Sequence, residues 1–214
     1  AELVYAEMMQ RAPKDRALSR PLQRLANVWA KSGDTERAAT LLDSELGQGE
    51  DQRIFNIMIK GIARKGGINA GRDAEQFLRQ IEKSKLEGSG PNTITYSTVI
   101  NAWAQSTDPH AGKEATRLLR EMQDTASSNP DVKPNVLSYS SAINAWAKSG
   151  HSDAGVKAEK LLQEMQKQAS SNPDVKPNVL SYNSAINAWA KSGHSDAGVK
   201  AEKLLREMQK QASS

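Results

Sequence analysis

Short hydrogen-bonding side chains and cationic side chains recur together at helical spacing in four stretches of the chain. Residues at every fourth position lie on one face of a helix. The four sets are Asn56, Lys60 and Arg64; Ser97, Asn101 and Gln105; Ser140, Asn144 and Lys148; and Asn183, Asn187 and Lys191. Hydroxyl and amide groups of this kind can read the edges of nucleic-acid bases, and a row of cations suits phosphates. The alternative is an ordinary solvated helix face, and the side-chain chemistry alone leaves both interpretations open.

Catalytic and metal-binding chemistry finds little support in the sequence. The chain has no cysteine, which excludes a disulfide framework and a cysteine-ligated zinc site. Residues 151–153 and 194–196 both read His-Ser-Asp, but each stands where a turn leads into a helix, so we interpret them as capping and loop residues. No nucleophile elbow, phosphate-binding loop or dinucleotide fingerprint is present. We therefore expect no catalytic residue, no metal, no cofactor and no small-molecule substrate.

The polar sets lie within a repeated stretch around which the chain is organised. PNVLSYSSAINAWAKSG begins at Pro134 and returns as PNVLSYNSAINAWAKSG at Pro177. A more divergent copy, PNTITYSTVINAWAQST, begins at Pro91, and the three prolines are 43 residues apart. A fixed period of this size is typical of a stacked repeat array.

The last two copies are almost identical. Residues 126–168 and 169–211 differ only at Ser140 against Asn183 and at Gln163 against Arg206. The first difference directly follows the tyrosine of each repeat, so we infer that this small polar residue carries specificity. Neutral drift is the alternative, because two differences are too few to separate the two explanations.

Each repeat predicts two helices. Tyr139, Ala142, Ile143, Trp146 and Ala147 form an apolar stripe at helical spacing, and a glycine follows as a stop signal. Residues 158–165 carry a second apolar stripe, and residues 170–178 read as a proline-rich connector. The tyrosines and tryptophans share the stripe with alanine and isoleucine, so we interpret them as packing between helices. In the third unit, Asp108 and Pro109 predict the start of the second helix as a cap and a first-turn proline.

The predicted fold class is all-α, a right-handed superhelical solenoid of stacked helix–turn–helix repeats with one concave face. No stretch alternates with the period of a strand, so we expect no β-structure. The expected divisions are 1–18, the second helix of a truncated repeat plus a linker; full repeats at 19–51, 52–92, 93–135 and 136–178; and an incomplete repeat at 179–214. The chain thus reads as one continuous piece of a longer array.

The charge balance is mildly basic. With 29 basic and 25 acidic residues, the net charge is +4 and the isoelectric point is about 9.2. This balance permits a polyanionic partner without requiring one. No apolar run approaches the roughly 20 residues needed to cross a bilayer, and no signal or transit peptide is visible, so we expect no membrane partner.

The units resemble pentatricopeptide repeats (PPR), the helical hairpins that bind single-stranded RNA one base per repeat. The likeness covers residues 19–214, with a half repeat before them. Its elements occur together and in order: a YN or YS start, a KSG turn, an LLxEM second helix and a KPN close.

The resemblance implies specific roles for residues of this chain. Two side chains per repeat choose the base: one follows the tyrosine, and the other is the last residue of the repeat. The implied base-reading residues are Asn56 with Asn92, Ser97 with Asn135, Ser140 with Asn178, and Asn183 without its partner. By the family's rule, Ser with Asn implies adenine and Asn with Asn a pyrimidine. Reading 5′ to 3′ along the chain, the implied core is pyrimidine-A-A-pyrimidine.

Two further sets follow from the same resemblance. Branched apolar residues two places before the tyrosine usually sandwich the base, and Ile94, Leu137 and Leu180 stand there. The phosphate-contacting place is occupied by Lys31, Arg64, Lys148 and Lys191.

The repeats depart from the usual length of roughly 35 residues. Three extra residues precede Ala158 and can lengthen the second helix, and five more precede Lys176. The second insertion lies next to Asn178, so the sequence leaves open whether that residue keeps its place. In the unit at 19–51 the base-reading pair is unfamiliar, and we expect that unit to be structural or promiscuous.

A tetratricopeptide-like scaffold for protein partners is the rival interpretation. That family expects a W-x2-L-G-x2-Y start and a repeat of about 34 residues, neither of which is present. We therefore expect sequence-specific RNA binding in RNA processing, stability or translation. Family members mostly act in mitochondria or plastids, and other RNA-processing proteins are further candidate partners.

Overall fold

The computed structural model describes residues 51–83 and 90–212, together with six single positions nearer the start: Leu25, Val28, Trp29, Ser32, Asp34 and Arg37. The expected division 1–18 and most of 19–51 lie outside the described residues, and so does Lys31. The boundaries between repeats stay predictions.

Eight α-helices and one 3-10 turn make up the described part. They are α4 (Asp51–Lys65), α5 (Ala70–Lys83), α6 (Thr93–Gln105), α7 (Ala111–Thr125), α8 (Val136–Ser149), α9 (Ala154–Gln168), η1 (Pro173–Val175), α10 (Val179–Lys191) and α11 (Ala197–Ala212). Within these residues no strand forms, and a single isolated bridge joins Gly67 to Ser106.

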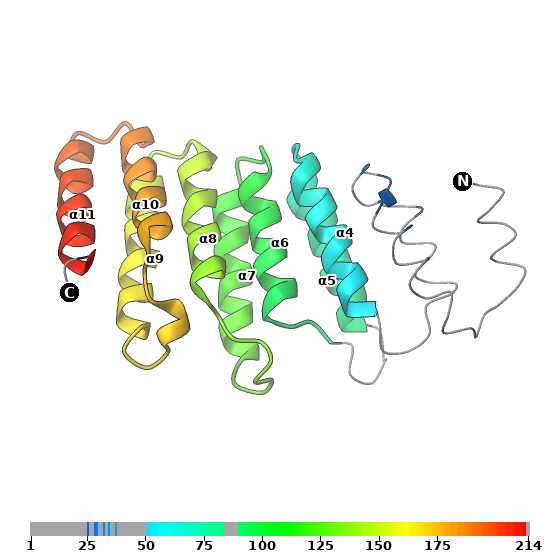
Figure 1. The fold of residues 1–214 in the computed structure, drawn as a ribbon. Coiled ribbons are helices and arrows are strands. Elements are labelled where there is room, and N and C mark those ends of the chain that lie inside the picture. Colours follow the sequence, from blue (N-terminus) through cyan, green and yellow to red (C-terminus); the bar gives the residue numbers. More distant parts are fainter. Residues whose placement is uncertain are drawn as a thin grey trace, which may run out of the picture.

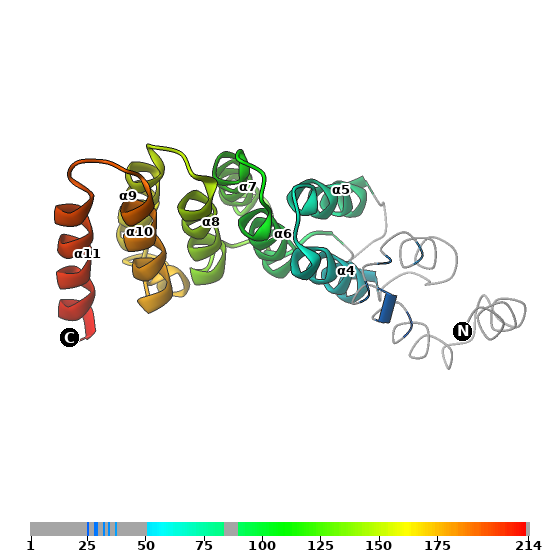
Figure 2. The ribbon, with the colours of Figure 1, turned by 90° about the horizontal axis from the view of Figure 1, so that it is seen from above.

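The helices stand side by side in chain order as a row of antiparallel hairpins (Figure 1). The first helices of the hairpins, α4, α6, α8 and α10, each contact the next along the array. The second helices α5, α7 and α9 lie in another layer and contact the first helix of the following hairpin (Figure 2). The predicted all-α solenoid is therefore confirmed, while the right-handed sense of its superhelix stays a prediction.

The aromatic stripe forms the contact between hairpins, as predicted. Tyr139 and Tyr182 are almost completely buried, and each tryptophan packs on a glycine of the preceding second helix. A Cβ on Gly112 would lie 2.5 Å from the ring of Trp146, so only glycine allows this approach. The three glycine–tryptophan pairs are Gly71 with Trp103, Gly112 with Trp146, and Gly155 with Trp189. Small residues early in each second helix thus fix the distance between neighbouring repeats.

Helix α7 begins later than the sequence indicated. Its first residue is Ala111, with His110 at the capping position, so Asp108 and Pro109 belong to the preceding turn. The prediction of a cap and a first-turn proline there was wrong. Asp108 is buried, binds Arg72 of α5 (3.0 Å) and accepts the backbone N–H of His110 (2.8 Å), so its carboxylate holds the turn that precedes α7.

The long connectors are built into the array. Val132 and Val175, one in each connector, are fully buried. The hydroxyl of Thr93 at the start of α6 donates to the carbonyl of Lys133 (2.8 Å), and the next connector binds back through Asn172, whose amide donates to the carbonyl of Pro134 (3.3 Å). The extra residues therefore fold against the preceding repeat instead of separating the hairpins.

Candidate functional site

The positions expected to contact phosphates, and Gln105 at the equivalent place, lie near the ends of the first helices. Arg64, Gln105, Lys148 and Lys191 stand near the ends of α4, α6, α8 and α10, and all four are exposed. The ammonium group of Lys148 donates to Oε1 of Gln105 (2.7 Å), although the two residues are 43 positions apart. The solenoid thus aligns equivalent positions of successive repeats.

The charge of Lys191 acts on Lys148. Partial burial lowers its pKa, and the nearby positive charge of Lys191 lowers it further. Both effects disfavour the charged ammonium group, and an anion bound between the two lysines would favour it. The row is therefore electrostatically suited to a phosphate.

The three asparagines that close the repeats all begin first helices. Asn92, Asn135 and Asn178 are the N-cap residues of α6, α8 and α10. In each, Oδ1 accepts the backbone N–H three residues on, at 3.0 Å for Thr95 and Ser138. This role fixes the amide orientation and leaves the NH2 group as the part that can face a ligand. Asn178 occupies the same position as Asn92, so the long connector does not shift it relative to its helix.

One of the expected base-reading pairs is in direct contact. The hydroxyl of Ser97 in α6 donates to Oδ1 of Asn135 at the start of α8 (3.4 Å). The equivalent hydroxyl of Ser140 in α8 is buried and has no hydrogen-bond partner among the described residues, and the same holds for Oδ1 of Asn56. A buried polar atom without a partner costs about 1–3 kcal/mol, so these positions are places where a ligand would compensate a deficit.

The residue that follows the tyrosine, or the phenylalanine in its place, is exposed in α10 but buried in the three earlier first helices. Asn56, Ser97 and Ser140 are 9%, 1% and 2% exposed. Asn183 in α10 is exposed. The expected base-reading positions Asn56, Ser97 and Ser140 are therefore buried, and a base edge would have to enter the packed array to reach them.

The branched apolar residues are unusually open to solvent. Ile94, Leu137 and Leu180 are 53%, 46% and 55% exposed in the first turns of α6, α8 and α10. Ile94 also borders a hollow of about 440 Å³ that includes Asn92 and Pro91. Three equivalent positions of successive repeats thus expose an apolar side chain, as Val179 and Val199 also do.

The sequence analysis missed the capping role of the asparagines. Asn135 Oδ1 binds the backbone of Ser138, and the Ser138 hydroxyl accepts the backbone N–H of Asn135 (2.9 Å). The signal was present, because the stretches NTIT and NVLS each place a hydroxyl residue three positions after the asparagine.

The two His-Ser-Asp segments lie at turns. His151 contacts the carbonyl of Pro109 through Nε2 (2.9 Å) and meets the edge of Trp146. His194 meets Trp189 in the same way. No cluster of three or more metal-ligating side chains exists among residues 51–83 and 90–212. None of the helices in the described part is long and apolar enough to span a membrane.

Comparison with protein families supports the resemblance over the second half of the chain. Residues 117–192 match the family model described as pentatricopeptide repeat domain. Residues 180–211 match a second model, described as PPR repeat. No curated protein matches the chain.

Proposed function

Because the chain is a pentatricopeptide repeat protein, we propose that it binds single-stranded RNA along α4, α6, α8 and α10, one base per repeat. Pentatricopeptide repeats are in general RNA-binding repeats without enzymatic activity. The observation that carries the proposal is the contact between Ser97 and Asn135 (3.4 Å). It joins two side chains 38 residues apart, across a hairpin boundary and a long connector. A base that entered between α6 and α8 at this contact would meet both side chains. We call the equivalent place between each two neighbouring first helices a crevice.

The roles of the side chains follow from their groups. At each crevice the asparagine that caps the helix offers its NH2 group to an acceptor on the base edge, because its oxygen already accepts a backbone N–H of that helix. The residue after the tyrosine then decides the size of the base: serine leaves room for a purine, and asparagine does not. The proposed base-reading residues are Asn56, Asn92, Ser97, Asn135, Ser140, Asn178 and Asn183.

Two further sets complete the proposed interface. The exposed aliphatic side chains of Ile94, Leu137 and Leu180 pack against the faces of the bases and shield them from water. The cations at the ends of the first helices, Arg64, Lys148 and Lys191, hold the phosphates, and Lys31 would extend the row. The proposed target is pyrimidine-A-A-pyrimidine, read 5′ to 3′ from the N-terminal side.

Bound in this way, the protein would cover a short single-stranded site and expose or hide it from other factors. We place this activity in RNA processing, stability or translation in a mitochondrion or plastid, following the family. A fluorescent fusion of the full-length protein, imaged with markers for both organelles, tests the location. A diffuse cytosolic signal would contradict it.

Fluorescence anisotropy tests the binding itself. Labelled RNAs that carry CAAC, CACC or a scrambled core are titrated with the protein at fixed salt, beside double-stranded RNA of the same sequence. We expect CAAC to bind most tightly and the duplex least, because a duplex cannot place its base edges in the crevices. Equal affinity for all four would overturn sequence-specific reading, and no binding to any would favour a protein-interaction scaffold.

A further inference from the structure

The second helices carry a residue that accepts a hydrogen bond from the tryptophan of the next repeat. This acceptor stands four residues after the glycine that contacts the same ring. The three donor–acceptor pairs are Trp103 Nε1 with Glu75 Oε2 (3.2 Å), Trp146 Nε1 with Thr116 Oγ1 (2.8 Å), and Trp189 Nε1 with Glu159 Oε2 (3.1 Å). The acceptor is thus a carboxylate on α5 and α9 but a neutral hydroxyl on α7.

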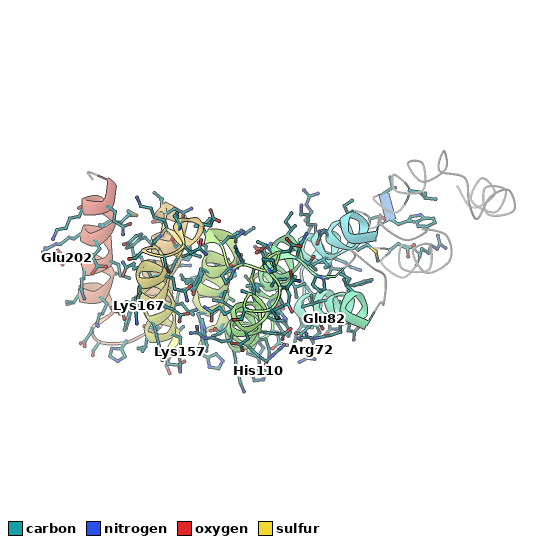
Figure 3. All side chains as sticks on the ribbon, turned by 90° about the horizontal axis from the view of Figure 1, so that it is seen from below. Arg72, Glu82, His110, Lys157, Lys167 and Glu202 are labelled. Atoms are coloured by element: carbon teal, nitrogen blue, oxygen red, sulfur yellow. The ribbon has the colours of Figure 1, made fainter. Side chains whose placement is uncertain are left out.

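A cavity of about 530 Å³ lies where the carboxylate is missing, between α7 and α9. Its lining includes His110, Lys113, Thr116, His151, Lys157 and Lys160. His110 and Lys157 lie on the same side of the array, at neighbouring positions along it (Figure 3). This is the side of the second helices, opposite the layer of first helices that carries the proposed RNA face (Figure 2).

The side chains that line this cavity carry more positive than negative charge: four of them are cations, and Asp153 is the carboxylate in the lining. Lys113 and Lys160 form no ion pair with any residue in the described part of the chain, and Lys157 has only a loose contact with Asp153 (3.8 Å). Arg120, which also lines the cavity, is bound by Glu164. Lysine side chains left without carboxylate partners attract an anion into a concave site.

The neighbouring gaps show the opposite arrangement. Between α5 and α7, Arg117 binds Glu75 (2.6 Å) and Arg72 binds Asp108 (3.0 Å). Between α9 and α11, Lys200 approaches Glu159 (3.6 Å). The carboxylate that accepts the tryptophan N–H therefore also neutralises a cation in both gaps, and Thr116 cannot do so.

We propose that the cavity between α7 and α9 binds a phosphate-bearing small molecule of about nucleotide size. The volume falls within the range of about 300–1,000 Å³ that is typical of small-molecule sites. Lys113, Lys157 and Lys160 would hold the phosphate, and His110 and His151 add ring nitrogens at the rim. The ligand is bound and not transformed, because the cavity contains no catalytic constellation.

Isothermal titration calorimetry with AMP, ATP and inorganic phosphate tests the site on wild type, Thr116→Glu and Thr116→Gln. We expect the nucleotides to bind wild type and Thr116→Gln. Thr116→Glu should weaken binding at least about tenfold, because it adds a negative charge among the lysines. The glutamate variant should fold, since Glu75 and Glu159 occupy the matching places, and its thermal unfolding by circular dichroism verifies this.

The outcomes separate the sources of the phosphate. Binding of inorganic phosphate as tightly as the nucleotides would overturn a ligand of nucleotide size. If both variants lost nucleotide affinity equally, or neither lost any, the role of the missing carboxylate would be overturned. If wild type bound no nucleotide, the site itself would be overturned. If Thr116→Glu instead weakens the binding of single-stranded RNA, the cavity belongs to the RNA-binding surface and the small-molecule proposal fails.

Discussion

At the scale of single residues, Asn135 has two tasks that use different atoms. Its Oδ1 caps α8 and accepts the hydroxyl of Ser97, while its NH2 group has no acceptor among the described residues. A base acceptor would therefore complete the hydrogen bonding of this side chain without disturbing the helix. Structure and recognition at this position can be separated by mutation.

Two substitutions of Asn135 make this separation. Asn135→Ala removes the cap and should lower the free energy of unfolding by about 1 kcal/mol. Asn135→Asp keeps a capping oxygen but replaces the NH2 donor by a second acceptor, so it should preserve stability and weaken CAAC binding. Urea unfolding and anisotropy on the same samples measure the two effects. If Asn135→Asp bound CAAC as well as wild type does, the NH2 group would have no role in reading the base.

The positions of these residues can be read from the sequence, but their surroundings cannot. The position of Ser140 after its tyrosine was readable from the repeat, but its burial depends on how closely α8 approaches its neighbours. Glycine positions such as Gly112 set that approach through contact with a tryptophan of another hairpin. No pattern local to α8 contains this distance.

At the scale of elements, the second helices are linked by ion pairs between repeats. Arg79 of α5 binds Glu121 of α7 (2.7 Å), and Arg120 of α7 binds Glu164 of α9. The same carboxylates accept the hydroxyls of buried tyrosines, as Glu164 does for Tyr139 (2.9 Å), and together with burial this raises the tyrosine pKa. These links join α5 to α7 and α7 to α9.

The series is interrupted before the last hairpin. Gln163 stands where Arg120 stands one repeat earlier, and its amide binds Glu159 on its own helix (3.3 Å). Gln163→Arg should restore a pair with Glu207 of α11 and raise the opening free energy of that helix by about 0.5 kcal/mol. Amide hydrogen exchange in α11 measures the change. The gain should vanish in a Glu207→Gln background, and a gain that persists there would contradict an ion pair.

Element boundaries show where sequence reasoning stopped. The hairpins were predicted from the apolar stripes, and the glycine at the end of α8 adopts the left-handed conformation that the stop signal implied (φ 72°). The predicted start of α7 was wrong because Asp108 and Pro109 belong to the turn before the helix. In that turn Asp108 binds Arg72 of the preceding hairpin. The course of the connectors was left open because it depends on contacts between residues far apart in the sequence, such as the bond from Thr93 to Lys133.

At the scale of the whole molecule, the array distributes its contacts evenly and has no single centre. Equivalent positions of successive repeats form lines along it, and the line of Arg64, Gln105, Lys148 and Lys191 is one of them. The sequence predicted this line from its period alone. A polymer with regularly spaced charges is the partner that such a line fits.

The salt dependence of RNA binding tests this line. With three cations contacting phosphates, the logarithm of the affinity should fall with the logarithm of salt concentration at a slope of about −2. Lys148→Gln, which copies the residue found at Gln105, should make the slope shallower by about 0.7 and leave the preference for CAAC unchanged. Titrations between low and physiological salt supply both slopes. An unchanged slope would remove Lys148 from the phosphate path.

The most direct test of the account is the base preference of the third crevice, measured as the affinity ratio of CAAC to CACC. Ser140→Asn recreates the asparagine of the adjacent repeat, Asn183, and Gln163→Arg, the other natural difference between the two copies, is the matched control. We predict that Ser140→Asn reverses the ratio in favour of CACC while Gln163→Arg leaves it at the wild-type value. An unchanged ratio in Ser140→Asn, with CAAC still bound, would contradict the assignment of bases to the crevices between first helices.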